Sequence, residues 1–166
     1  MGRPGIGFLP GRITAVGDSV MIDYEALLAK DLPGISIAAT VSEQWATGIN
    51  TLASLRAHDQ LGATVIVGLG TNGPVTPTLI ASMLSVLHGA SRIVLVTEHV
   101  DQPWQNQNNA LIFATAKSHA HIVVANWYAR SRLHPGWFYS DQTHLPPGGV
   151  GASHLAWIIR QATRRP

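Results

Sequence analysis

The sequence predicts an α/β protein, a three-layer α/β/α sandwich built around a five-stranded parallel sheet. The chain has 166 residues, which is the length of one ordinary domain with a substantial core. Hydrophobic residues make up 46% of it and charged residues 12%, a composition typical of a compact globular protein. Short apolar, β-branched runs alternate with longer helical stretches. This alternation is the pattern of an open sheet that is covered on both faces.

Strands are predicted where the apolar runs are too short for helices and nearly continuous, as buried parallel strands are. The predicted strands are Arg12–Val16, Ile35–Ala39, Thr64–Val67, Arg92–Thr97 and His121–Ala125. Helices are predicted from the spacing of apolar residues and from start signals such as Thr-Pro. The predicted helices are Val20–Lys30, Glu43–Ala57, Thr76–His88, Pro103–Ser118 and a last one after Pro146–Gly149. In such sheets ligands bind beyond the carboxyl ends of the strands, so chemistry is sought there.

Residues 12–166 are predicted to form a single domain, and residues 1–11 a linker or disordered start, because this start is rich in glycine and proline. The start lacks the apolar stretch of a signal peptide. No apolar run approaches the length of a membrane span, so this segment is not expected to cross a membrane. If the domain works outside the cytoplasm, its export signal is expected on a longer parent chain.

Charge and cysteine content exclude several kinds of function. The formal net charge is +2, and no stripe of Lys and Arg with interleaved aromatic residues is present, which argues against nucleic-acid binding. The chain has no cysteine, which excludes disulfides, thiolate zinc sites and a cysteine nucleophile. This absence fits the cytosol and an extracytoplasmic space equally. His119 and His121 lie two residues apart, but no third ligand follows at suitable spacing, so no metal is expected.

The first polar motif, Gly17-Asp18-Ser19-Val20, follows the first predicted strand. Glycine allows a sharp turn, and Ser19 then falls at the start of a helix. Its hydroxyl would point into the crevice, and neighbouring backbone N–H groups would face a developing oxyanion. The alternative interpretation is an ordinary helix cap, because Asp and Ser are both common at that position.

The second motif, Gly70-Thr71-Asn72-Gly73, follows the third predicted strand. The carboxamide of Asn72 can donate a hydrogen bond to a tetrahedral oxyanion, a contribution of roughly 3 kcal/mol in measured cases. The alternative is a plain Asn-Gly turn without a chemical role.

The third motif, Asp141-Gln142-Thr143-His144, precedes the last predicted helix. Asp141 can accept the Nδ1 proton of His144, which leaves Nε2 free as a base toward a serine hydroxyl. The alternative is a loop that carries two unrelated polar residues. Together the three motifs supply a nucleophile, an oxyanion donor and an oriented base, which are the parts that acyl transfer requires.

The three motifs resemble the first, third and fifth sequence blocks of the SGNH/GDSL hydrolases, in order and in spacing. A narrower likeness is to the extracytoplasmic SGNH domain of membrane acyltransferases, including peptidoglycan O-acetyltransferases. The segments that carry this likeness are Gly17–Met21, Val41–Gln44, Pro103-Trp104 with Asn109, and Asn126–Tyr128. The resemblance implies a flavodoxin-like SGNH fold. It also implies transfer or removal of acetyl groups on a carbohydrate polymer of the cell-wall type, at an extracytoplasmic location.

The resemblance also implies roles for individual residues. The predicted catalytic residues are Ser19, Asp141 and His144; the predicted oxyanion donors are Ser19, Ser42 and Asn72. Weaker predictions of substrate contact fall on Asp18, Gln44, Gly70 and Trp137. Trp137 could form a sugar-stacking wall or simply pack in the core. The implied partners are an acyl ester or acetyl donor, a carbohydrate acceptor and a membrane acyltransferase module on the same parent chain. Neither a metal nor an organic cofactor is expected.

The chain departs from the narrower family at several positions. Val41-Ser42 stands where Val-Gly is expected, Gln102 where Arg is frequent and Asn126 where Asp is frequent. Two alternatives therefore stay open: a free carbohydrate or lipid esterase, and a catalytically silent glycan-binding domain of a membrane acyltransferase. A flavodoxin-like cofactor binder would share the layer pattern. However, no Gly-x-Gly-x-x-Gly loop follows the first predicted strand.

Overall fold

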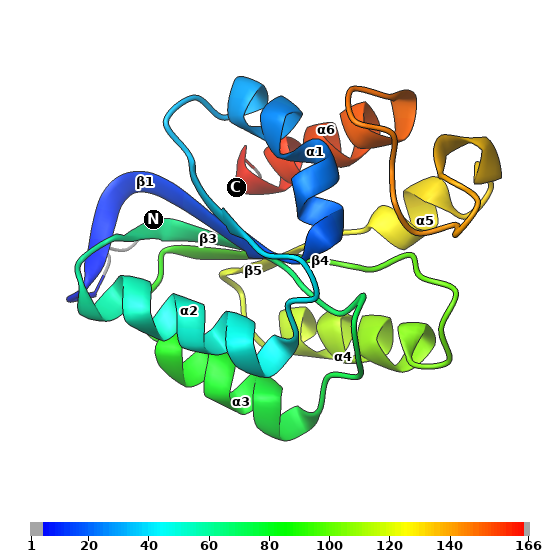
Figure 1. Cartoon of the computed structure of the whole chain (residues 1–166). Coiled ribbons are helices and arrows are strands. Elements are labelled where there is room, and N and C mark those ends of the chain that lie inside the picture. The colour runs from blue at the N-terminus through cyan, green and yellow to red at the C-terminus, as the bar shows by residue number, and fades with distance from the viewer. Residues whose placement is uncertain (1–4, 165–166) are drawn as a thin grey trace.

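The computed structural model describes residues 5–164, which form three layers around a five-stranded parallel sheet (Figure 1). The strands are β1 (Phe8–Gly17), β2 (Ser36–Ala39), β3 (Leu61–Gly68), β4 (Arg92–Val96) and β5 (Ile122–Ala125). Their order across the sheet is β2-β1-β3-β4-β5, and every neighbouring pair is parallel. The predicted fold class is confirmed.

Helices cover both faces of this sheet. They are α1 (Ser19–Asp31), α2 (Trp45–Ala57), α3 (Pro77–Val86), α4 (Gln105–Lys117), α5 (Trp127–Ser131) and α6 (Val150–Arg164), with a 3-10 turn η1 (Pro135–Trp137). Helices α1, α5 and α6 lie over one face, and α2, α3 and α4 lie over the other (Figure 1). Within residues 5–164 no helix is long and apolar enough to cross a membrane.

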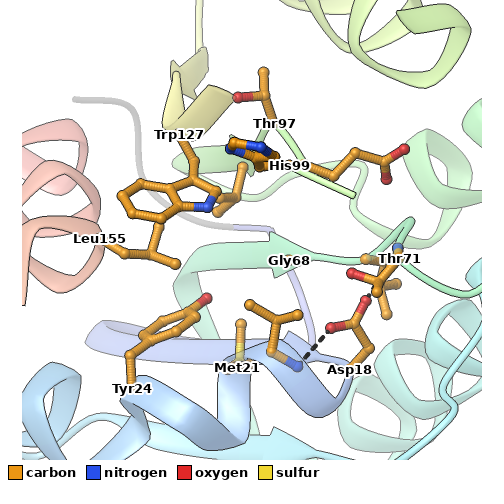
Figure 2. A pocket seen from close by; sticks show the side chains of 13 residues that line it. Asp18, Met21, Tyr24, Gly68, Thr71, Thr97, His99, Trp127 and Leu155 are labelled. Atoms are coloured by element: carbon orange, nitrogen blue, oxygen red, sulfur yellow. Dashed lines mark hydrogen bonds between the residues drawn. The ribbon is translucent and has the colours of Figure 1, made fainter. Parts of the chain in front are cut away.

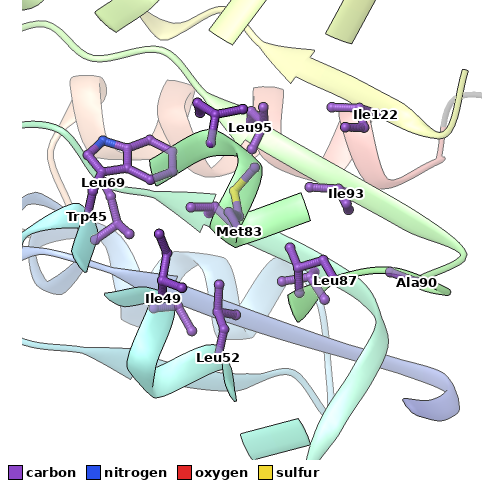
Figure 3. Close-up of a cluster of buried hydrophobic side chains, with 14 of the residues drawn as sticks. Trp45, Ile49, Leu52, Leu69, Met83, Leu87, Ala90, Ile93, Leu95 and Ile122 are labelled. Atoms are coloured by element: carbon purple, nitrogen blue, oxygen red, sulfur yellow. The ribbon is translucent and has the colours of Figure 1, made fainter. Parts of the chain in front are cut away.

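Two hydrophobic clusters, one on each face of the sheet, hold the layers together. There are two because successive side chains of a strand point to opposite faces. On β3, Val65 and Val67 join the cluster shared with α2, α3 and α4, which Figure 3 shows around Trp45 and Met83. Ile66, the residue between them, joins the cluster shared with α1, α5 and α6. The central strands are thus buried on both faces, which explains their nearly continuous apolar sequence.

Two predicted helix starts are confirmed in atomic detail. The side chain of Thr76 accepts the Leu79 N–H at 3.2 Å, and Pro77 follows as the first helical residue of α3. Asp18 caps α1 by accepting the Val20 N–H at 3.0 Å. The cap places Ser19 at the first position of α1, directly after β1.

The start of the domain is a correction to the prediction. Strand β1 begins at Phe8, so residues 8–11, predicted as linker, belong to the sheet. The reason is that the Phe8 side chain is buried and that Phe8 pairs with Leu61 of β3. The register of this pairing shifts between Leu9 and Ile13. Residues 1–4 of the predicted linker lie outside the described residues. Helix α5 and the turn η1 were not predicted either.

Candidate active site

The loops after β1, β2 and β3, which carry Ser19, Ser42 and Asn72, start from one edge of the sheet. Gly17, the last residue of β1, pairs with Ala39 of β2 and with Gly68 of β3. Because these parallel strands end level with one another, the chain leaves all of them at the same place. Gly17 is itself tightly packed, since an added Cβ would lie 2.6 Å from the Met21 side chain.

The structure brings Ser19, His144 and Asp141 together. Ser19 Oγ lies 3.0 Å from His144 Nε2, although 125 residues separate the two in the chain. On the other side of the ring, His144 Nδ1 lies 2.7 Å from Asp141 Oδ2. The imidazole therefore bridges the hydroxyl and the carboxylate, and the tautomer with the proton on Nδ1 leaves Nε2 to accept from Ser19.

Asp141 is held by the loop that it belongs to. Its Oδ1 accepts the backbone N–H groups of Thr143 and His144, both at 3.0 Å. Partial burial opposes ionisation, but the hydrogen bond from His144 and these two backbone bonds outweigh it and lower the pKa of Asp141. Asp141 is consequently a carboxylate at neutral pH, as a partner of the imidazole must be.

Asp23 anchors the same loop to α1 and was not predicted from the sequence. Its Oδ2 accepts the Leu145 N–H at 3.0 Å, directly after His144. Burial raises the pKa of Asp23, against the effect of this bond. The sequence held one signal: Asp23 lies four residues after Ser19 and so projects from the same side of the helix. One helix therefore carries both the serine and a tether for the histidine loop.

Ser42 and Asn72 lie on the loops that follow β2 and β3. The Asn72 carboxamide donates one of its two N–H groups to the Glu43 carbonyl at 3.0 Å. The second N–H group is left to serve as a donor. Ser42 has φ +61°, in the left-handed region that favours glycine. The backbone at this position thus keeps the conformation for which a glycine is suited, while the residue is a serine.

Asp18 is buried and links two of the loops. Besides capping α1, it accepts the Thr71 N–H at 3.3 Å (Figure 2). Burial raises the pKa of Asp18 to about 6, and the hydrogen bonds from Val20 and Thr71 lower it in part. Its side chain borders a small cavity of about 30 Å3, which Tyr24 and Trp127 also line. These contacts favour a structural role for Asp18 over the predicted contact with substrate.

The other three weak predictions of substrate contact fall on quite different surroundings. Gly70 is buried, and its carbonyl accepts the Trp104 indole N–H at 3.0 Å, which favours a structural role. Gln44 is exposed at the start of α2, where its backbone N–H and carbonyl bond the Thr47 hydroxyl. The contact of Gln44 with substrate therefore stays a prediction.

Trp137 does not offer a free face to a sugar. Its ring lies between the imidazoles of His134 and His154, at centroid distances of 4.0 and 4.5 Å and in nearly parallel planes. Arg130 donates to His154 Nδ1 at 3.0 Å and so steadies one side of this stack. Of the two interpretations of Trp137, the structure favours packing over sugar stacking.

A serine, an imidazole and a carboxylate stand in one hydrogen-bonded series at the carboxyl edge of a parallel three-layer sandwich, an arrangement of the kind expected for a serine-dependent acyl-transfer site of the SGNH type. Among the described residues, no group of three or more His, Asp or Glu side chains could hold a metal ion. The residues present fit acyl chemistry that is carried by side chains.

Comparisons with known proteins agree with this class. No protein-family model matches the chain. Over 138 residues it is 36% identical to the peptidoglycan O-acetyltransferase OatA of Listeria monocytogenes, which covers 83% of this chain and 22% of that protein. The C-terminal catalytic domain of Streptococcus pneumoniae OatA, solved with a methylsulfonyl adduct, superposes with a TM-score of 0.86 at 24% identity, covering 96% and 94% of the two chains.

A member of the lipolytic G-D-S-L family from Veillonella parvula shares the fold, with a TM-score of 0.72 at 12% identity, covering 95% of this chain and all of that one. The chain has the fold of the SGNH/GDSL hydrolases, and over most of its length it is similar in sequence to part of the peptidoglycan O-acetyltransferase OatA. It spans about a fifth of the length of the Listeria protein that it matches.

Proposed function

We propose that this domain transfers acetyl groups on a carbohydrate of the cell-wall type, or removes them, through an acyl-enzyme on Ser19. The observation that carries the proposal is the continuous hydrogen-bonded series from Ser19 Oγ through His144 to Asp141, with distances of 3.0 and 2.7 Å. The likeness to peptidoglycan O-acetyltransferases supports the choice of acetyl group and glycan.

In the first step His144 Nε2 takes the hydroxyl proton of Ser19, and Ser19 Oγ attacks the carbonyl carbon of an acetyl ester. Asp141 keeps the proton on Nδ1 and stabilises the imidazolium that forms. The tetrahedral intermediate then breaks the bond to the leaving alcohol, and His144 returns the proton to that oxygen. The acetyl group remains on Ser19 as an ester.

In the second step His144 takes a proton from water or from a sugar hydroxyl, whose oxygen attacks the acetyl carbon. The tetrahedral intermediate then breaks the bond to Ser19 Oγ, and His144 returns the proton to that oxygen. Water gives acetate, which makes the domain an esterase, whereas a sugar hydroxyl gives an O-acetylated glycan. The negative charge on the intermediate would be held by the backbone N–H groups of Ser19 and Ser42 and by the remaining N–H of Asn72. The N–H of Ser19 suits this task because it lies in the first turn of a helix, where N–H groups lack intrahelical partners.

The proposal extends to the surroundings of the domain. The resemblance to membrane acyltransferases supports a location outside the cytoplasm, on a longer chain whose membrane module supplies the acetyl group. The domain would then receive the acetyl group from the membrane module of the same chain and transfer it to the glycan.

Replacing Ser19 with alanine is the direct test. We expect Ser19→Ala to reduce hydrolysis of a chromogenic acetyl ester by about 10⁴-fold or more, because the nucleophile is removed. A fluorophosphonate should label Ser19 in the wild type and leave the variant unlabelled, as followed by mass spectrometry. Ser82→Ala, an exposed serine on α3, is the matched control and should keep full activity. Wild-type rates in Ser19→Ala would contradict the proposal.

A second measurement separates the alternatives. With a soluble cell-wall oligosaccharide present, a transferase should produce acetylated oligosaccharide, whereas a free esterase should release only acetate. A catalytically silent glycan-binding domain should bind the oligosaccharide, with neither turnover nor labelling of Ser19.

A further inference from the structure

The loop that carries Asn72 is held by one fully buried side chain of α4. Asn108 Oδ1 accepts the Val75 N–H at 2.8 Å, and Asn108 Nδ2 donates to the Gly73 carbonyl at 3.1 Å. The same Nδ2 donates to Glu98 Oε1 at 2.9 Å. The carboxamide of Asn108 thus uses both of its ends on backbone groups immediately after Asn72.

Glu98 lies beside Asn108 and is also buried. Its Oε2 rests against Gly70, so closely that a Cβ at position 70 would lie 1.7 Å from it. Gly70 has φ +128°, which only glycine adopts without strain. The side chain of Asn109 fixes the Glu98 backbone by bonding both its N–H and its carbonyl, each at 2.9 Å. Glu98 is therefore held in place and limits the space available to the start of the loop at Gly70.

Core packing alone does not account for this arrangement. A buried carboxyl and a buried carboxamide cost free energy unless they are well bonded, and apolar residues would fill the same space without that cost. What the polar pair adds is direction, because hydrogen bonds define one conformation of the loop. Asn108 bonds the loop at Gly73 and Val75, after Asn72. Glu98 Oε2, which has no hydrogen-bond partner among the described residues, packs against Gly70, before Asn72.

We propose that Glu98 and Asn108 are positioning residues for the reaction: they hold the loop after β3 so that Asn72 points its free N–H at the oxyanion. This inference rests on the proposed function. Neither residue touches the reacting atoms, so both act through Asn72. A shift of the donor by about 1 Å is enough to lower the rate strongly.

The protonation state of Glu98 indicates which substitution preserves the contact of this side chain with Gly70. Burial, together with the nearby charge of Asp18, raises the pKa of Glu98 to about 8, against the hydrogen bond from Asn108. Glu98 is then mostly a neutral carboxylic acid at neutral pH, and glutamine has the same shape and charge. Glu98→Gln should rescue what Glu98→Ala loses.

The test is a double-mutant cycle with Asn72→Ala, measured on an acetyl ester at pH 7. We expect Glu98→Ala to lower kcat about tenfold with little change in KM, because the oxyanion donor is displaced while the substrate still binds. In the Asn72→Ala background, where the donor is already gone, Glu98→Ala should change kcat less than about twofold. Glu98→Gln should stay within about threefold of the wild type.

Asn108→Asp provides a second, independent arm. It keeps the acceptor for Val75 but loses the donor to Gly73 and Glu98, so the same dependence on Asn72 is expected. Thr115→Val is the matched control: Thr115 is a buried hydroxyl of α4 that bonds within its own helix at Leu111, and its loss should leave kcat unchanged. Circular dichroism and thermal unfolding should verify that each variant is folded.

The outcomes separate the two proposals. If the wild type is active and Ser19 is labelled, but Glu98→Ala and Asn108→Asp have the same effect with and without Asn72, the positioning role is wrong and the proposed function stands. Full activity of both single variants has the same meaning. A wild type without labelling or turnover overturns the proposed function and the positioning role with it.

Discussion

At the scale of single residues, Ser42 is a residue with a side chain in a backbone conformation for which glycine is suited. Its φ of +61° lies in the left-handed region, which costs about 1–2 kcal/mol for a residue with a Cβ. The proposed contribution of Ser42 is its backbone N–H, which any residue except proline supplies. The conformation of the backbone, rather than the side chain, is therefore what the proposed oxyanion site requires.

Ser42→Gly tests this view. We expect acetyl-ester hydrolysis within about twofold of the wild type, and a melting temperature equal or slightly higher, because relief of strain offsets the greater entropy of the unfolded chain. Ser42→Val, with a branched Cβ at the same φ, should be less stable. A Ser42→Gly variant as inactive as Ser19→Ala would mean that the serine side chain itself takes part.

At the scale of elements, helix α1 organises both halves of the candidate site. Its first residue is Ser19, and one turn later Asp23 binds the backbone of the loop that carries His144. The cap residue Asp18 ties the same helix to the loop after β3. Ser19, the loop of His144 and the loop of Asn72 are thus connected through α1 and its cap, which limits how far any of them can move alone.

Asp23→Ala should loosen the histidine loop. We expect kcat to fall several-fold and labelling of Ser19 by a fluorophosphonate to slow in parallel, because the Leu145 N–H loses its acceptor and the loop gains freedom. Asp23→Asn, which keeps an acceptor oxygen, should retain most of the activity. Glu25→Ala, an exposed acid on the same helix, is the control. Equal rates for Asp23→Ala and the wild type would rule out the tether.

At the scale of the whole molecule, two buried carboxyl groups make folding stability depend on pH. Burial raises the pKa of Glu98 from its ordinary 4.5 to about 8 and that of Asp18 from 3.8 to about 6. In the unfolded chain these groups lose their protons at lower pH than in the folded one. Their contribution is therefore fully present below the unfolded values and is lost as pH rises through the folded values.

For Glu98 the window runs from about pH 4.5 to about pH 8. We expect the free energy of unfolding, measured by urea titration, to fall across this range in the wild type and to fall less steeply in Glu98→Gln. The remaining slope up to about pH 6 should come partly from Asp18. Glu25→Gln, on the surface, should follow the wild type. Parallel curves for the wild type and Glu98→Gln would show that Glu98 titrates normally.

Much of the fold could be predicted because local patterns carry it. The strand cores and five of the helices follow from runs of apolar residues and from caps such as Thr76. Their ends could not be predicted as well. Phe8 joins β1 because it finds a place in the core, and the short helix α5 has too few residues for a periodic pattern.

The residues that face each other in the candidate site were also visible in the sequence, because Ser19, Asp141 and His144 are chemically distinctive and lie beside predicted helix starts. Only the tertiary structure decided that they meet, with 3.0 Å between Oγ and Nε2. It alone revealed Glu98 and Asn108, and it alone showed that Asp23, which the sequence places on the same side of the helix as Ser19, binds the backbone after His144. Their significance comes from burial and from partners far away in the chain, and no local pattern encodes either.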